Sequence, residues 1–134
     1  MEKKFNTVYD LVIEEYFKST KIPSKKLYLE LKPNLVLKDI KEASAVVLTK
    51  LKITAFEEES KEICFEFLCE MQSECNFQGI ESEELKDCAV DVGIQHYAII
   101  RSRLRSLSLM TSSPVLNIPI INTTQLKKVL TVEA

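Results

Sequence analysis

The sequence predicts an α+β fold in which four strands form an antiparallel sheet and are followed by one long and one short helix. In the first half of the chain, apolar and polar residues alternate, and short polar turns separate the runs, as is typical of half-buried strands. In the second half, apolar residues recur at helical spacing. Hydrophobic residues make up 46% of the 134 and charged residues 28%, which is ordinary for a folded protein. We therefore expect residues 1–134 to form a single domain.

The strands are expected in the first half of the chain, at residues 7–18, 27 to about 33, 47–55 and 63–72. The first run alternates imperfectly, and Pro23 ends it because proline lacks an N–H and has a fixed φ. Residues 35–37 are a candidate continuation of the second run after a bend at Pro33. The glutamates at 57–59 lie in the turn before the fourth strand. Short turns between successive strands favour antiparallel pairing.

A long helix is expected from Ser82, whose hydroxyl can cap it, to about Ser112, before Pro114. Gly93 is a candidate break in this helix, because glycine has a low helix propensity. Residues 114–122 are expected to be extended because of their two prolines. Thr123 or Thr124 then caps a short helix over residues 125–130.

Composition excludes several classes of protein. The formal net charge of −2 leaves no positive excess to neutralise a phosphate backbone, so nucleic acid is not an expected partner. No apolar run has the length of a membrane span and the first residues do not form a signal-peptide core, so we expect a cytoplasmic protein without membrane insertion. Four cysteines without metal-site spacing are expected to be reduced, buried thiols: Cys64, Cys69, Cys75 and Cys88.

Candidate catalytic groups are few. His96 is the single histidine, and we expect it on the surface of the long helix. Arg101, Arg103 and Arg105 are spaced over different helix faces, which favours ion pairing or interface packing over an anion site. The serines have no general base nearby in sequence, and no phosphate-binding glycine loop or metal-ligand pattern is present. We expect no enzyme activity, no cofactor and no metal.

Two motifs resemble the SecB family of protein-export chaperones. The run FLCEMQ at residues 67–72, followed by Phe77 and Gly79–Ile80, is similar to the family's fourth strand and its turn. Further along, the spacing of four residues is similar to the family's segment after the long helix: Pro114, Leu116, Asn117 and Asn122. The resemblance covers about residues 46–126 and implies helices packed on one side of the sheet, a homotetramer built as a dimer of dimers, and apolar grooves that bind unfolded polypeptides.

The resemblance also implies docking to the export motor SecA through acidic residues of the sheet, of which Glu70 matches. Ser19, Thr20 and Lys21 stand where the family tends to be acidic, and Ala98–Ile99 replaces its proline-tyrosine pair. The first interpretation that the resemblance implies is a general export chaperone, which keeps unfolded clients competent for export through the Sec translocase. The departures at these positions argue against motor docking. They favour a second interpretation, a SecB-like chaperone dedicated to one client such as the antitoxin of a toxin-antitoxin system. A SecB-fold adaptor without client binding is the third.

Apolar residues in two segments are more numerous than a small sheet-and-helix layer can bury, and we expect them to line the groove for clients: Leu27, Tyr28, Leu29, Leu35, Val36, Leu37, Ile118, Ile120, Ile121, Leu126 and Val129. One face of the fourth strand is too apolar to be exposed without aggregation. We therefore expect four of its residues in the core or at a subunit interface: Phe65, Phe67, Cys69 and Met71. On the long helix, we expect Arg101 and Leu104 at a subunit interface.

Overall fold

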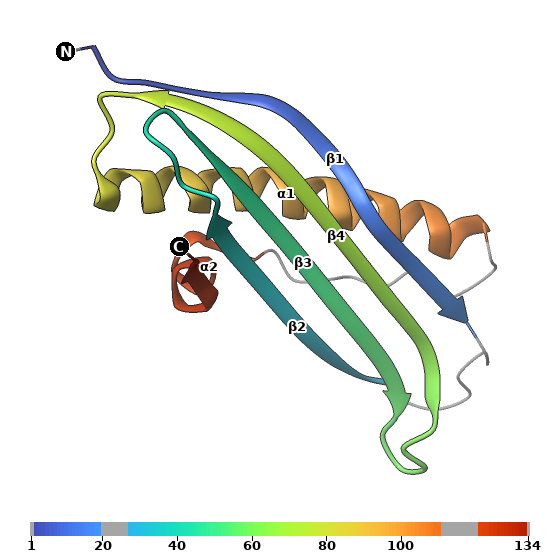
Figure 1. The fold of residues 1–134 in the computed structure, drawn as a ribbon. Coiled ribbons are helices and arrows are strands. Elements are labelled where there is room, and N and C mark those ends of the chain that lie inside the picture. The colour runs from blue at the N-terminus through green and yellow to red at the C-terminus, as the bar shows by residue number, and fades with distance from the viewer. Residues whose placement is uncertain (1, 20–26, 111–120, 134) are drawn as a thin grey trace.

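The computed structural model describes residues 2–19, 27–110 and 121–133. The elements are, in chain order, β1 (Lys4–Ser19), β2 (Leu27–Lys38), β3 (Ser44–Glu57), β4 (Ile63–Gln78), α1 (Ser82–Met110), α2 (Thr123–Val129) and β5 (Leu130–Val132). The strands form one sheet in the order β1-β4-β3-β2-β5. The long helix α1 crosses one face of this sheet, and α2 lies beside the end of β2 (Figure 1). The predicted α+β class is therefore confirmed.

The expectation of a purely antiparallel, four-stranded sheet is wrong. The sheet has five strands, and β5 pairs in parallel with β2 along Leu35–Leu37. The other neighbouring strands pair antiparallel, as expected. A three-residue strand carries too little alternation to be recognised in a sequence. It pairs with β2 because α2, which directly precedes it, is docked beside that strand.

The core lies between α1 and one face of the sheet, here called the helix face; the opposite one is the outer face. Most odd-numbered residues of β3 and β4 are buried on the helix face, and the residues on the outer face are mostly half-buried. The antiparallel register places Ile53 beside Phe67 and Leu51 beside Cys69, so one odd row continues across both strands. This burial explains why the alternation in these two segments is so clear.

The apolar row of β4 is part of this core. Of the two alternatives expected for this row, core or subunit contact, the structure shows the core, since four side chains are buried within one chain: Phe65, Phe67, Cys69 and Met71. Leu104, which we expected at a subunit interface, is also buried within the chain. The physical reason is that α1 covers this side of the sheet and removes these side chains from the surface. Arg101 is half-buried on α1, and its place at an interface stays a prediction.

The edge strand β1 departs from simple alternation because it contains two register shifts against β4. They lie between Thr7 and Tyr9 and between Val12 and Glu14. Each irregularity reverses which face the following residues occupy. Leu11 therefore lies on the outer face, opposite Gln72, whereas Phe17 lies on the helix face, opposite Phe67. These shifts are the reason why the alternation of residues 7–18 is imperfect.

Gly93 does not interrupt α1, which is continuous from Ser82 to Met110. Its importance is steric. A Cβ atom at this position would lie 3.1 Å from Leu35 Cδ1 and 3.2 Å from Leu126 Cδ1. Both leucines are fully buried. The missing side chain thus lets α1 approach β2 and α2 together.

We expect Gly93→Val to destabilise the protein by about 1–3 kcal/mol, because the added methyl groups overpack a contact that has no spare room. The free energy of unfolding in urea measures this. The control is Ala98→Val on the exposed side of the same helix, which should lose only about 0.5 kcal/mol of helix propensity. Equal losses for the two variants would contradict the steric role.

Candidate functional site

An apolar hollow lies between β2 and the start of α2. It has a volume of about 170 Å³ and is lined by Leu31 and Pro33 of β2 together with Ile121 and Gln125. Leu31 and Pro33 are half-buried, as are Leu27 and Leu29 earlier on the same face of β2. The hollow is therefore the end of a row of half-buried apolar side chains on the helix face of β2.

A capping box shapes the C-terminal wall of the hollow. The Asn122 side-chain oxygen accepts a hydrogen bond from the Gln125 N–H at 2.9 Å, and Gln125 Oε1 accepts one from the Asn122 N–H at 2.9 Å. These bonds satisfy backbone donors at the helix start. The expected cap at Thr123 or Thr124 is therefore wrong, because the cap is Asn122 and α2 begins at Thr123.

Two further contacts hold α2 against the rest of the chain. Leu126 is fully buried next to Gly93, and Lys127 Nζ lies 3.5 Å from Asp87 Oδ1 on α1. The ion pair is exposed and contributes little. The docking of α2, and hence the width of the hollow, depends mainly on Leu126.

Tyr97 fixes the β2 side of the same region. Its hydroxyl accepts a hydrogen bond from the Asn34 N–H at 3.2 Å and donates one to the Lys50 carbonyl at 2.7 Å. Burial raises the pKa of Tyr97 well above its ordinary value, so the hydroxyl keeps its proton and remains a donor. This side chain of α1 thereby ties β2 and β3 together beside Pro33.

The residues expected to line a client groove are not all at the surface. Ile118 and Ile120 lie outside the described residues. Leu35, Leu37 and Leu126 are buried in the core, so the expectation of an open groove does not hold for these three in the isolated chain. They pack beneath α1 because they face it from β2 and α2.

The remaining expected groove residues are divided between two sides of the sheet. Leu27 and Leu29 lie on the helix face in the half-buried row. Ile121 lines the hollow, although only 8% of its surface is exposed. Tyr28 and Val36 lie on the outer face, where Tyr28 is 55% exposed and its ring centroid is 5.0 Å from that of Phe56. Val129 is half-buried at the end of α2.

Sequence reasoning missed three residues of the hollow: Leu31, Pro33 and Gln125. The alternation of β2 does place Leu31 on the same face as Leu27 and Leu29, so this signal was present. Pro33 was instead interpreted as a bend. The strand continues through it, because its missing N–H points away from the ladder with β3. No pattern pointed to Gln125, whose position depends on where α2 docks.

His96 is buried in the core, with 1% of its surface exposed, so the expected place on the helix surface is wrong. Its Nδ1 atom lies 2.7 Å from Thr49 Oγ1, and its Nε2 atom lies 2.6 Å from Ser73 Oγ and 3.2 Å from Asp10 Oδ1. Ser73 in turn donates a hydrogen bond to Asp10. The polar side chains of β1, β3 and β4 therefore converge on one histidine, which is why a polar residue is tolerated there.

This cluster is not arranged as a nucleophilic triad. Ser73 is completely buried, and Asp10 contacts the same histidine nitrogen as the serine instead of the opposite one. Because Ser73 donates to Asp10, its oxygen accepts from the Nε2–H of His96, and Nδ1 accepts from Thr49. The network satisfies the buried polar groups of His96, Ser73 and Thr49, and the hydroxyl of Ser73 is not accessible to a substrate.

The cysteine thiols are also poorly placed to react. All four cysteines are free thiols; three are buried, and Cys88 is half-buried. Burial raises the pKa of Cys69 and of Cys75 to about 11, which disfavours thiolate chemistry. Among the described residues, no group of three or more potential ligands is placed to hold a metal ion. None of the helices in residues 2–19, 27–110 and 121–133 is long and apolar enough to cross a membrane.

The residues considered for docking or pairing have identifiable neighbours. Glu70 is half-buried on the outer face, between Glu14 of β1 and Lys50 of β3 in the register. Arg103 donates a hydrogen bond from Nε to Glu15 of β1 at 2.7 Å. Arg103 therefore forms an ion pair, one of the roles expected for the helix arginines, and this pair ties α1 to the edge strand β1.

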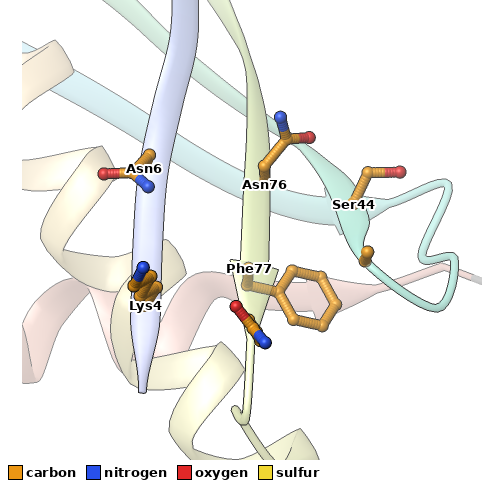
Figure 2. Close-up of a pocket in the computed structure, with 7 residues that line it drawn as sticks. Lys4, Asn6, Ser44, Asn76 and Phe77 are labelled. Carbon is orange, nitrogen blue, oxygen red and sulfur yellow. The ribbon is translucent and has the colours of Figure 1, made fainter. Parts of the chain in front are cut away.

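A second hollow lies at the corner of the sheet where β1 begins and β4 ends. Figure 2 shows Lys4 and Asn6 of β1 beside Asn76 and Phe77 of β4 and Ser44 of β3. Its volume is about 390 Å³. Lys4 is the one cationic side chain among the described residues that line it, and its Nζ atom lies 3.9 Å from Glu2 Oε2. Most of the described residues that line this open hollow are polar, and they include no nucleophile paired with a base.

Neither a protein-family model nor a curated protein matches the sequence. Solved structures do match. A SecB-like chaperone of Mycobacterium tuberculosis, in complex with a ChAD peptide from the HigA1 antitoxin, superimposes with a TM-score of 0.68 at 16% identity, covering 87% of this chain and 90% of that one. A protein of unknown function from Streptococcus agalactiae has a TM-score of 0.45 at 9% identity, covering 89% and 99%; so weak a likeness carries no argument. The described chain therefore has the fold of a SecB-like chaperone.

Proposed function

We propose that the protein is a cytoplasmic molecular chaperone that holds segments of non-native polypeptides and has no catalytic role. The observation that carries this proposal is the apolar hollow of Leu31, Pro33, Ile121 and Gln125, which continues the half-buried row of β2. Covering apolar surface stabilises a complex by about 25 cal/mol per Å² before ordering costs are subtracted. A site of this kind binds many sequences weakly, which suits a chaperone.

The fold supports the proposal, since the similar structure from Mycobacterium tuberculosis is a SecB-like chaperone with a bound peptide. The test is the aggregation of a chemically denatured model enzyme, followed by light scattering after dilution into buffer. Equimolar protein is expected to suppress the scattering. If scattering is unchanged at every ratio, the protein is instead an adaptor with this fold and without client binding.

The range of clients separates two versions of the function. A general export chaperone would bind many secretory precursors and the motor SecA, with Glu70 among the docking residues. A dedicated chaperone would bind one small partner, such as an antitoxin. We favour the dedicated version, because the similar structure holds an antitoxin peptide and Glu70 has a lysine neighbour in the register. Titration of purified SecA into the protein decides between them: heat of binding supports export, and its absence supports a dedicated client.

We also propose that the protein is a homo-oligomer, a dimer of dimers, that uses β1. This edge strand exposes large apolar side chains on both faces: Val8, Leu11, Val12, Ile13 and Tyr16. Exposed apolar edge strands favour association with another chain.

Introducing two charges by Val8→Lys with Ile13→Lys is therefore expected to lower the molar mass in size-exclusion chromatography with light scattering. The control is Val132→Lys, which changes a similarly exposed valine on β5 at the other edge. The use of β1 is contradicted if the double variant keeps the wild-type mass, or if the wild-type protein is a monomer.

A further inference from the structure

The middle of β1 is paired less regularly with β4 than its two ends are. Register shifts lie between Thr7 and Tyr9 and between Val12 and Glu14, so residues 9–12 form a short segment with an irregularity at each end. Such irregularities interrupt the hydrogen-bond ladder. Because β1 is an edge strand, β4 is also its one neighbour in the described sheet (Figure 1). Residues 9–12 can therefore separate from the sheet at a lower cost than a segment of an interior strand.

The two ends of β1 are held by contacts of their own. Phe5 and Phe17 pack against the core from opposite ends of the strand. Close to the first, Lys3 Nζ forms an ion pair of 2.9 Å with a carboxylate of α1. Close to the second, Glu15 accepts a hydrogen bond from Arg103 of α1. These contacts anchor both ends, so an opening of β1 is expected to be confined to its middle.

The middle segment carries the side chain that contacts buried His96. Asp10 Oδ1 lies 3.2 Å from His96 Nε2 and accepts a hydrogen bond from Ser73 of β4. The Asp10 side chain is 45% exposed, whereas that of His96 is 1% exposed. The strands β3 and β4, which place Thr49 and Ser73 against the ring, each have two neighbouring strands. Of the strands around this histidine, β1 is therefore the one that opens to water most easily.

The closed site disfavours a protonated His96. In the neutral ring, Nε2–H donates to Ser73 and Nδ1 accepts from the Thr49 hydroxyl, so a proton on Nδ1 would face a group that already donates to it. Burial lowers the pKa of His96 from its ordinary value of 6.5, and Asp10, the charged group in contact with the ring, opposes this only in part. Cys75, two residues along β4 from the serine, stays neutral because burial raises its pKa to about 11. Hydration of the ring would remove this penalty.

We propose that residues 9–12 of β1 form an acid-sensitive latch, which opens when His96 takes up a proton and closes when the ring is neutral. Opening lets water reach the charged ring from the side that Asp10 occupies. It also uncovers Met71 of β4, which lies opposite Val12 and is buried in the closed form. Acid thereby exposes apolar surface at this edge while the rest of the sheet stays formed.

Hydrogen exchange of the full chain, followed by mass spectrometry at about pH 7.5 and about pH 5.5, tests the latch. Protection factors, which correct for the intrinsic effect of pH on exchange, are compared for residues 9–12, for the two ends of β1 and for residues 47–53 of β3. Residues 9–12 are expected to be at least about tenfold less protected than 47–53, and their protection should not respond to dilute urea, because their opening exposes little surface.

The expected effect of acid follows from the titration of the opened histidine. An exposed imidazole with the ordinary pKa of 6.5 is about ten parts protonated to one part neutral at pH 5.5. Tenfold is therefore about the largest shift that the proton can cause, and partial protonation of the closed form reduces it. We expect protection of residues 9–12 to fall by about three- to tenfold at the lower pH, and that of the two anchored ends to change by less than about twofold.

Three variants connect the opening to the proton on the histidine. His96→Gln keeps a hydrogen-bonding side chain that does not titrate, and should abolish the effect of pH on the latch. Asp10→Asn keeps an oxygen acceptor but removes the charge that favours the protonated ring in the closed form, so the fall in protection should be larger than in the wild-type protein. Glu14→Gln is the matched control, because it removes the same charge from β1 on the outer face, opposite Glu70, and should leave the effect unchanged.

Each variant is compared with itself at the two pH values, so a difference in overall stability cancels. If His96→Gln does not fold, the contrast between Asp10→Asn and Glu14→Gln still decides. The latch is refuted by equal protection of residues 9–12 at both pH values, or by an undiminished fall in His96→Gln. It is also refuted if the two ends of β1 lose as much protection as the middle, since the whole strand then opens, or if residues 9–12 exchange only through global unfolding.

Discussion

Leu31→Asp is expected to abolish most of the aggregation suppression while the protein stays folded. The substitution places a carboxylate in the hollow between β2 and α2, where Leu31 is half-buried. A bound apolar segment would have to cover this charge without giving it a partner, which costs several kcal/mol. We expect at least about a tenfold loss of apparent affinity for a denatured client, because 1.4 kcal/mol already accounts for that factor.

The measurement is light scattering of a denatured model enzyme at increasing amounts of each variant. Asn34→Asp is the matched control, because it adds the same charge to an exposed position on the other face of the same strand. It should suppress aggregation as the wild-type protein does. Equal activity of the two variants would mean that clients bind elsewhere, and equal loss would point to a general effect of charge.

His96→Leu is expected to reduce the free energy of unfolding by about 2–4 kcal/mol, the largest effect on stability among the variants considered. Leucine fills a similar space but leaves the buried hydroxyls of Thr49 and Ser73 without their histidine partner. Each buried polar group without a partner costs about 1–3 kcal/mol. Asp10 on β1 also loses its contact with α1.

Urea unfolding measures this change. Gln95→Leu, at the neighbouring exposed position of α1, is the control and should alter stability by less than about 0.5 kcal/mol. If His96→Leu is as stable as wild type, the network contributes nothing beyond packing.

The same network predicts how stability depends on pH. Burial lowers the pKa of His96 from its ordinary value of 6.5, and the hydrogen bond and charge of Asp10 oppose this effect only in part. The unfolded chain therefore binds a proton at a higher pH than the folded chain does. Stability is fully present above pH 6.5 and falls as the pH drops below that value toward the folded pKa.

Unfolding free energies measured from about pH 7.5 down to about pH 5.5 should decline for the wild-type protein and stay nearly level for His96→Leu. Asp10 is the charged group in contact with this histidine, so Asp10→Asn should steepen the decline. Parallel profiles for the wild-type protein and His96→Leu would show that other groups cause the pH dependence.

Much of the secondary structure was predictable because its signals are local. The alternation of β3 and β4 reflects a single buried face, and Ser82 and the proline at 114 bracket the long helix. The edge strand was harder, because two register shifts change the face of its residues, and shifts of this kind leave only imperfect alternation.

The candidate site was predictable only in part. Its two contributing segments, β2 and the region of α2, were recognised as too apolar to be fully buried. Which of their residues remain accessible depends on α1, since Leu35 and Leu126 are covered where Gly93 approaches them. A local pattern contains no information about such an approach.

The sequence by itself determined the α+β class, the order of the long elements and the absence of a recognisable catalytic motif, because composition, periodicity and capping are properties of neighbouring residues. Only the tertiary structure decided that His96 is buried, that β5 joins the sheet in parallel and that a hollow opens between Leu31 and Ile121. Each of these depends on contacts between residues distant in the chain, whose geometry is set by how α1 and α2 pack on the sheet.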